Sequence, residues 1–427
     1  MGVLWSFRSK PVRRSVPSSG VPGFVAGEVN NARLIQFIHT PECVTQQVRN
    51  LVSEIIMDGR QQIVDLIRKV NWAGLKHAYG EASDVSAQLS DLLSDDEALQ
   101  SAALESLYSN IFHQGSRFEA STQAVPFLLY MLQTEEVKNK PEIIRLLAHL
   151  AIGYQESYLP LGFQWRPEPQ YSYAAAVQSY NAVGRGTDIF LSLLNHPDNT
   201  LRLHAAFILG WFPAKGRQTR NTIVERIAVE TCDKTKANLI VALGLLDGYE
   251  NTRQNETLFR EHLRNGTPLV RTASALALTR LMQAETDRET LDVLIKGLET
   301  YSGRYIADVF PWQDGDLVGY ISSSFHLLGS NAAPILLDPL LAQLASSNAF
   351  TGIEIVAVLL RYFFTDPEEG HVVTKESLAP VQRRILETVA ANKQMCPDSN
   401  EVFLNFWDIF SHYGLPDSPQ KLRELLA

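Results

Sequence analysis

The sequence predicts an all-α fold, an α-solenoid of stacked antiparallel helix pairs, and three observations lead to this prediction. A short phrase of small and apolar residues recurs in the segments 201–210, 238–244 and 270–279. Its Leu-Gly pair stands at 209–210 and again 34 residues later at 243–244, a period typical of stacked helical repeats. Apolar residues elsewhere follow three- and four-residue spacing, and strand signals are nearly absent. In such an array each repeat contacts only its neighbours, and the product is a long surface.

The first 40 residues are predicted to form a disordered basic tail. Residues 1–27 contain four bases and three prolines, and no acid precedes Glu28. Two functional interpretations remain open beside disorder. Gly2 followed by Ser6 fits the N-myristoylation pattern, which together with the bases would give weak membrane association. The acid-free Arg- and Ser-rich composition also fits an organelle transit peptide, although the prolines would break its amphipathic helix.

From residue 41 to residue 427 the chain is predicted to be helix after helix. The amphipathic pattern is clear at 44–57, 61–70 and 85–93. Helix starts are marked by residues whose side-chain oxygens accept hydrogen bonds from free backbone amides: Asp198-Asn199-Thr200, Asp233 and Ser330-Asn331. The final helices are expected at 402–413 and 420–426, where they would cap the array.

Two stretches, 92–103 and 193–205, share one pattern. In each, a helix ends in a Leu pair, a polar turn with Asp follows, and a second helix opens with small Ala residues that permit close helix packing. This pattern resembles HEAT repeats, and the resemblance covers about residues 85–415. It implies a ladder between successive repeats built from pairs such as Asp198 and Arg202. The ladder is incomplete, because Gln100 and Lys236 replace Arg and Thr267 replaces Asp.

The phrases at 72–80, 111–115 and 310–316 are similar to bacterial-type HEAT repeat proteins without assigned activity. That resemblance implies a fold and transfers no catalytic residue.

Two inserted loops are predicted, near 154–185 and 301–316. The helix-ending positions 153, 210, 244, 279 and 329 are separated by 57, 34, 35 and 50 residues, so the first and last intervals exceed the repeat. Insertions in repeat proteins often collect on the binding face, and Trp, Tyr and Arg dominate interface hot spots. The expected binding residues are therefore Tyr154, Tyr158, Trp165, Arg166, Arg304, Tyr305, Trp312, Asp314 and Asp316.

The densest polar stretch of the array is 109–121, and it carries the only candidate catalytic residues, His113, Arg117 and Glu119. A His and a Glu within hydrogen-bond reach could act as general acid and base. The alternative is structural: His113 and Gly115 end one helix, and Ser121 caps the next.

Other chemistry has little support in the sequence. Asp314 and Asp316 resemble only part of a calcium loop, and there is no zinc-protease, nucleophile-elbow or phosphate-loop motif. The three cysteines are far apart, so no metal and no cofactor is predicted.

The net charge and the hydropathy of the chain limit the classes of partner that are expected. The net charge is −9, and with the four bases of the tail set aside 34 bases face 47 acids, which argues against broad nucleic-acid binding. No run of about 18 apolar residues occurs, so no transmembrane segment is predicted, and the expected location is intracellular, in the cytoplasm.

The expected function is a noncatalytic protein-binding scaffold, or a regulatory or accessory protein, that uses the concave face and the aromatic loops. The alternative is a HEAT-fold enzyme or accessory biosynthetic protein acting on a small molecule or modified base, with chemistry near His113 and Glu119.

Overall fold

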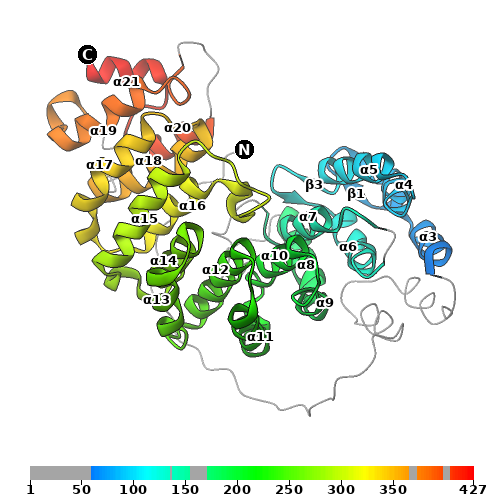
Figure 1. Ribbon diagram of the computed structural model, residues 1–427. Coiled ribbons are helices and arrows are strands. Elements are labelled where there is room, and N and C mark those ends of the chain that lie inside the picture. The colour runs from blue at the N-terminus through cyan, green and yellow to red at the C-terminus, as the bar shows by residue number, and fades with distance from the viewer. Residues whose placement is uncertain (1–58, 135–136, 154–170, 365–372, 398–403) are drawn as a thin grey trace, which may run out of the picture. The chain divides into compact units, whose positions relative to one another are not determined.

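The computed structural model describes residues 59–134, 137–153, 171–364, 373–397 and 404–427. Within these ranges it contains nineteen α-helices and two small β-hairpins, which confirms the all-α prediction (Figure 1). None of the described helices is both long and apolar enough to cross a membrane. The chain divides into two compact units. The larger unit is Leu34–Pro339, and the smaller unit includes Leu340–Ala427.

The helices of the larger unit follow one another with short connections. They are α3 (Gly59–Lys69), α4 (Val85–Asp91), α5 (Glu97–Asn110), α6 (Glu119–Met131), α7 (Lys140–Ile152), α8 (Tyr171–Gly184), α9 (Thr187–Leu193), α10 (Asn199–Leu209), α11 (Gly216–Val229), α12 (Asp233–Glu250), α13 (Glu256–Asn265), α14 (Pro268–Met282), α15 (Arg288–Tyr301) and α16 (Leu317–Ser324). Helix α17 (Ala333–Leu344) crosses the division between the units.

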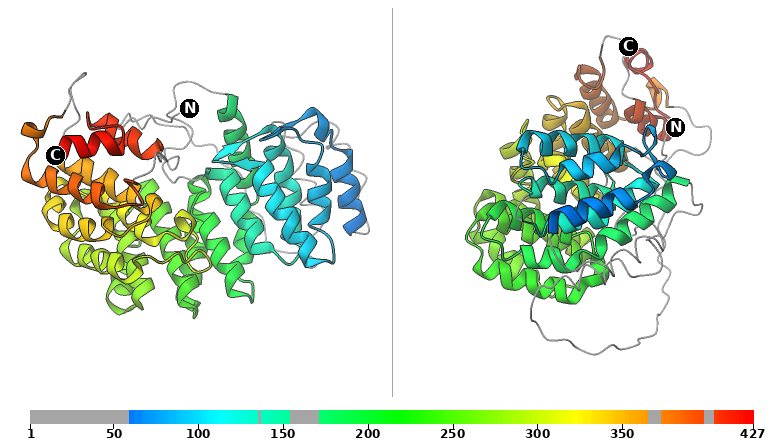
Figure 2. Two further views of the ribbon diagram at one scale, coloured as in Figure 1. Left: turned by 90° about the horizontal axis from the view of Figure 1, so that it is seen from above. Right: turned by 90° about the vertical axis from the view of Figure 1, so that its right-hand side faces the viewer.

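Helices α7, α10, α12 and α14 pack side by side in chain order, each against the next (Figure 2). The recurring Leu-Gly pair makes these contacts close. A Cβ built on Gly244 would lie 2.5 Å from the Cβ of Ala277, and one on Gly210 would lie 3.2 Å from the Cα of Ala242. The repeated glycines are therefore points where neighbouring helix backbones approach each other. The prediction that positions 244 and 279 end helices was wrong, because α12 continues to Glu250 and α14 to Met282.

The two hairpins were not predicted. Strand β1 (Lys76–His77) pairs with β2 (Gly80–Glu81), and β3 (Phe112–His113) pairs with β4 (Ser116–Arg117). Between β3 and β4, Gln114 and Gly115 have φ values of 47° and 78°, which form a type I′ turn. The prediction that His113 and Gly115 end a helix was wrong, because α5 has already ended at Asn110. Ser121 does serve the start of α6, since its Oγ accepts a hydrogen bond from the Phe118 amide at 2.7 Å.

The helix-start predictions hold at Asp198, whose carboxylate accepts a hydrogen bond from the Thr200 amide at 2.7 Å. Helix α12 begins at Asp233, and the short turn at Ser330–Ala332 precedes α17. The first insertion is shorter than predicted, because α8 starts at Tyr171, and residues 154–170 lie outside the described part of the chain. The predicted tail, residues 1–40, and the predicted helix 44–57 also lie outside it.

The smaller unit contains α18 (Ala349–Phe363), α19 (Pro380–Ala391), α20 (Leu404–His412) and α21 (Pro419–Leu426). Asn392, after α19, donates hydrogen bonds to the carbonyl oxygens of Leu344 and Ser347 and so fixes the turn before α18. The aromatic side chains of α20, Phe406, Trp407 and Phe410, are buried and form a core.

Candidate functional site

The two hairpins follow α3 and α5 at equivalent places, and their loops lie against each other. The rings of Tyr79 and His113 are 5.4 Å apart, and the Tyr79 hydroxyl lies 3.4 Å from Nδ1 of His113. Tyr79 is 66% exposed, whereas His113 is half-buried. We call Tyr79, His113 and Gln114 the hairpin surface.

His77 holds the first hairpin in place through two hydrogen bonds. Its Nδ1 accepts a hydrogen bond from the Tyr79 amide at 3.0 Å, so the ring proton is on Nε2, which donates to Asp84 Oδ1 at 2.9 Å. The other carboxylate oxygen of Asp84 accepts hydrogen bonds from Gln88 and Asn110. The His77–Asp84 pair therefore has a structural role: it joins the hairpin to the first turn of α4 and the end of α5.

The candidate catalytic residues do not converge. Among the described residues, the His113 ring has Tyr79 as its partner and makes no hydrogen bond to Glu119. The Glu119 carboxylate accepts a hydrogen bond from the Lys76 amide at 3.2 Å, and the buried Arg117 donates to the carbonyl oxygen of Gly115. The predicted His–Glu acid–base pair is thus not formed in this structure.

The second predicted insertion is a loop, residues 302–316, that runs back to α7. The Asp314 carboxylate lies 3.0 Å from Nε2 of His149 and 3.9 Å from the Arg145 guanidinium. Burial acts to raise the pKa of Asp314, but the hydrogen bond and charge of His149, with the charge of Arg145, outweigh it and lower the pKa. Asp314 therefore keeps its charge at neutral pH, and it binds α7, a helix that ends at Ile152.

His149 connects this loop to the second hairpin. Its ring stacks on Phe112 of β3, with centroids 5.1 Å apart and planes 9° apart, and meets the edge of Tyr108. Asp314, His149 and Phe112 thus form a continuous chain of contacts from the loop to the hairpin.

Trp312 anchors the loop instead of presenting a binding side chain. Its side chain is fully buried, with ring centroids 4.9 Å from Phe207 and 5.3 Å from Trp211. The indole N–H donates to Oδ1 of Asn238 at 2.7 Å, and Nδ2 of Asn238 donates to the Val309 carbonyl at 2.8 Å. The expectation of a partner-contacting Trp312 is corrected here, because the apolar ring is more stable against the aromatic side chains near α10 than in water.

The other predicted binding residues of this loop have different environments. Asp316 is buried and accepts a hydrogen bond from the Gly319 amide at 2.8 Å, which caps α16. Arg304 is exposed, and Tyr305 is 57% exposed. The predicted binding residues of the first insertion, Tyr154, Tyr158, Trp165 and Arg166, lie outside the described residues.

The turn that carries Asp314 is strained. Gln313, Asp314 and Gly315 have φ values of 50°, 52° and 89°, and only the last is a glycine. A left-handed conformation costs a residue with a side chain about 1–2 kcal/mol. The ion pair that the turn makes is part-exposed at Asp314, and such pairs contribute about 0–1 kcal/mol. The two contributions are of similar size, so the Asp314 ion pair does little more than offset the cost of the turn, whose Gln313 and Gly315 carbonyl oxygens also accept hydrogen bonds from the Asp316 and Ile306 amides.

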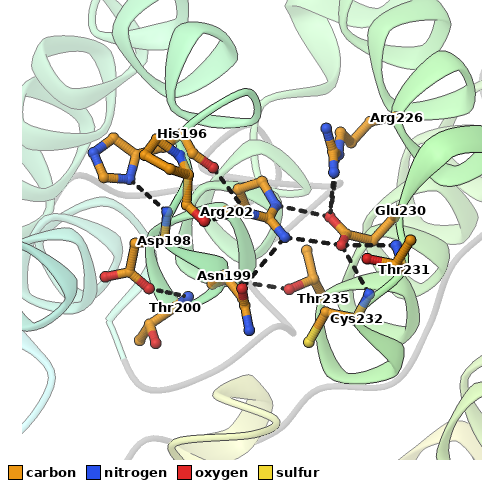
Figure 3. Close-up of polar contacts among 11 residues, drawn as sticks. His196, Asp198, Asn199, Thr200, Arg202, Arg226, Glu230, Thr231, Cys232 and Thr235 are labelled. Atoms are coloured by element: carbon orange, nitrogen blue, oxygen red, sulfur yellow. Dashed lines mark hydrogen bonds and ion pairs between the residues drawn. The ribbon is translucent and has the colours of Figure 1, made fainter.

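A second polar cluster lies between α10, α11 and α12 (Figure 3). The Arg202 guanidinium forms two hydrogen bonds with Glu230, at 2.8 and 2.9 Å, and also donates to the carbonyl oxygens of His196 and Pro197. The Glu230 side chain is fully buried and also pairs with Arg226. The resemblance implied a pairing of Arg202 with Asp, and the structure differs: Arg202 binds Glu230, while Asp198 caps α10.

Burial alone would raise the pKa of Glu230. Hydrogen bonds from Arg202, the Cys232 amide and Arg226 outweigh this effect and lower the pKa to about 2. These bonds satisfy the carboxylate completely, so the cluster stabilises the junction between α10, α11 and α12 and leaves no open position for a ligand.

Asp247 in α12 has a buried carboxylate with fewer hydrogen bonds than Glu230 and with its nearest counter-charge farther away. It accepts a hydrogen bond from Asn255 at 2.8 Å, while its Oδ1 has no hydrogen-bond partner and lies 3.7 Å from Nε of Arg220. Arg220 lies closer to Glu250, at 2.6 Å. Burial therefore raises the pKa of Asp247 to about 6, although the Asn255 bond and the Arg220 charge oppose the rise.

No group of three or more metal-binding side chains comes together in the described part of the chain. The polar residues with close partners are used in caps, hairpins and helix junctions. Exposed aromatic side chains include Tyr79 at the hairpin surface and Tyr305 in the 302–316 loop, besides Tyr249 on α12 and Phe350 on α18.

Comparison with known proteins assigns no family. The chain matches no protein-family model, and no curated protein matches it significantly.

Proposed function

We propose that this chain is a HEAT-like α-solenoid that acts as a noncatalytic scaffold, and that it binds a protein partner through the hairpin surface. The solenoid is inferred from helices α7, α10, α12 and α14, which pack in chain order with glycines at their contacts.

One observation carries the proposed binding role. Tyr79 is 66% exposed, yet its backbone and ring are held by His77 and His113. A large aromatic side chain fixed before binding loses little conformational entropy when a partner covers it. Tyr is also among the residues enriched in interface hot spots.

Arg304 and Tyr305 extend the proposal to the exposed part of the 302–316 loop. Both side chains belong to residue types enriched in protein interfaces, and both remain exposed in this structure. The partner is therefore proposed to be a protein, and the proposed location is intracellular.

The enzyme alternative has less support. His113 and Glu119 have separate partners, and the His77 ring is held in one tautomer by its neighbours. A general acid–base pair needs both groups within reach of one substrate atom and free to exchange a proton.

The test uses affinity purification of the tagged full-length protein from its native host, followed by mass spectrometry. Three forms are compared: wild type, Tyr79→Ala, and Tyr249→Ala as a matched control on α12, where Tyr249 is 43% exposed. We expect a stoichiometric protein with wild type and the control, and its loss with Tyr79→Ala. Equal recovery with all three forms would exclude the hairpin surface, and a bound small molecule without any protein would favour the enzyme alternative.

A further inference from the structure

We propose that residues 302–316 form a strap with one fixed end and one releasable end, which locks α7 to the helices that follow it. This device is independent of the proposed binding function, because it is inferred from contacts within the larger unit alone.

The fixed end is the segment 309–312. Trp312 is fully buried against Phe207 and Trp211, and Asn238 holds the segment by two hydrogen bonds, one to the indole and one to the Val309 carbonyl. Phe207 is on α10 and Asn238 is on α12, so this end of the strap bridges two neighbouring helices.

The junction between α10 and α12 leaves space for the fixed end of the strap, because the residue after α10 is Gly210. A Cβ on Gly210 would lie 2.9 Å from the Trp312 ring, so the glycine after α10 admits the indole as well as the backbone of α12. The fixed end is therefore part of the core and is not expected to leave it while the unit stays folded.

The releasable end is Asp314. Its side chain is 45% exposed, and it binds α7 only through polar contacts, with His149 at 3.0 Å and Arg145 at 3.9 Å. The turn that delivers it places Gln313 and Asp314 at positive φ, a conformation that favours release once the ion pair is lost.

The strap joins helices that are not successive in the packing order. Helix α7 packs against α10, α10 against α12, and α12 against α14, whereas Asp316, two residues after Asp314, caps α16. In a repeat array each unit contacts its neighbours, so a small rotation at every junction adds up along the array. A contact between α7 and the segment before α16 limits that rotation, and its release would let the inner surface open.

The test compares amide hydrogen exchange in full-length wild type, Asp314→Asn and Asp308→Asn. Asp308 is an exposed acid of the same loop and makes no hydrogen bond or ion pair in the described part of the chain, so it is the matched control. We expect exchange about two- to fivefold faster in Asp314→Asn within residues 313–316 and 148–153, and wild-type rates in the control. Amides of α12 around Asn238 should keep wild-type rates, because the fixed end stays in place.

A second variant, Arg145→Met, removes only the longer ion pair and leaves the loop sequence intact. It should accelerate the same two segments by a smaller factor, and it keeps the test open if Asp314→Asn folds poorly. Unchanged exchange in both variants would overturn the proposal, as would an equal effect of Asp308→Asn. Faster exchange throughout α12 would show that the strap has no fixed end.

Discussion

The buried carboxylate of Asp247 provides a quantitative prediction about pH. Its pKa is raised by burial from 3.8 to about 6, which makes ionisation unfavourable in the folded state. A shift of about 2 units corresponds to about 3 kcal/mol at 1.36 kcal/mol per unit. The folded state binds the proton more tightly than the unfolded state. The contribution of Asp247 to stability is therefore greatest below pH 3.8, decreases as the pH rises to about 6, and is constant above that.

The substitution Asp247→Asn removes this titration and keeps an oxygen that can accept the bond from Asn255. Urea unfolding, followed by tryptophan fluorescence between pH 4 and pH 7.5, gives the free energy of unfolding of both proteins. We expect the difference between variant and wild type to change by about 2.5 kcal/mol in favour of the variant across this range, because part of the effect has already occurred at pH 4. Contributions of all other groups cancel in that difference, because they are common to both proteins.

Glu225→Gln is the matched control, because Glu225 is an exposed acid on the neighbouring helix α11 and is not among the groups that shift the pKa of Asp247. It should leave the pH profile nearly parallel to that of wild type. A pH-independent difference between Asp247→Asn and wild type would refute the reasoning, because it would mean that Asp247 ionises normally in the folded protein.

Two further predictions concern the junctions of α12 with its neighbouring helices and use the same unfolding assay. Glu230→Gln should lower the free energy of unfolding by about 3–5 kcal/mol at pH 7, because it leaves the Arg202 guanidinium buried without its counter-charge. The loss should shrink as the pH falls from about 4.5 towards 2, where wild-type Glu230 itself becomes protonated. A pH-independent loss would contradict the lowered pKa of Glu230. Gly244→Ala should lower the free energy of unfolding by about 1–3 kcal/mol, because the new Cβ would lie 2.5 Å from the Cβ of Ala277. The control Gly248→Ala, whose Cβ would have its nearest atom at 3.3 Å, should lower it less. Equal effects would mean that the close approach at Gly244 is not needed.

The helical part of the fold could be predicted from local signals. The period-3.6 patterns and the Asp198 cap are each encoded within a few neighbouring residues, and the structure has helices at these places. The Leu-Gly pair was a weaker signal, because it was predicted to end helices and at 243–244 it lies inside α12. The hairpins could not be found in the same way, because their strands are two residues long and show no alternation. The Gln114-Gly115 pair was the one available signal, and a glycine after a helix is equally typical of a helix end.

The site depended on contacts that no local pattern contains. His149 and Asp314 are 165 residues apart, so their pairing is visible only in the fold. The aromatic residues of the 302–316 loop were predicted to bind a partner, but only some of them are accessible: Trp312 is in the core, and Tyr305 is exposed. Likewise Arg202 was expected to pair with an Asp, and Glu230 is closer because the turn before α12 carries it into the junction.

The most direct test of the proposed scaffold role is oxidative footprinting of the full-length protein, comparing the purified chain with the same chain in a lysate of its native host. Hydroxyl-radical labelling of Tyr79 and Tyr249 is measured in both samples, because both tyrosines are exposed in the free chain. The scaffold account predicts that Tyr79 is protected in the lysate while Tyr249 is labelled as in the purified protein. Equal labelling of Tyr79 in both samples would contradict a partner at the hairpin surface.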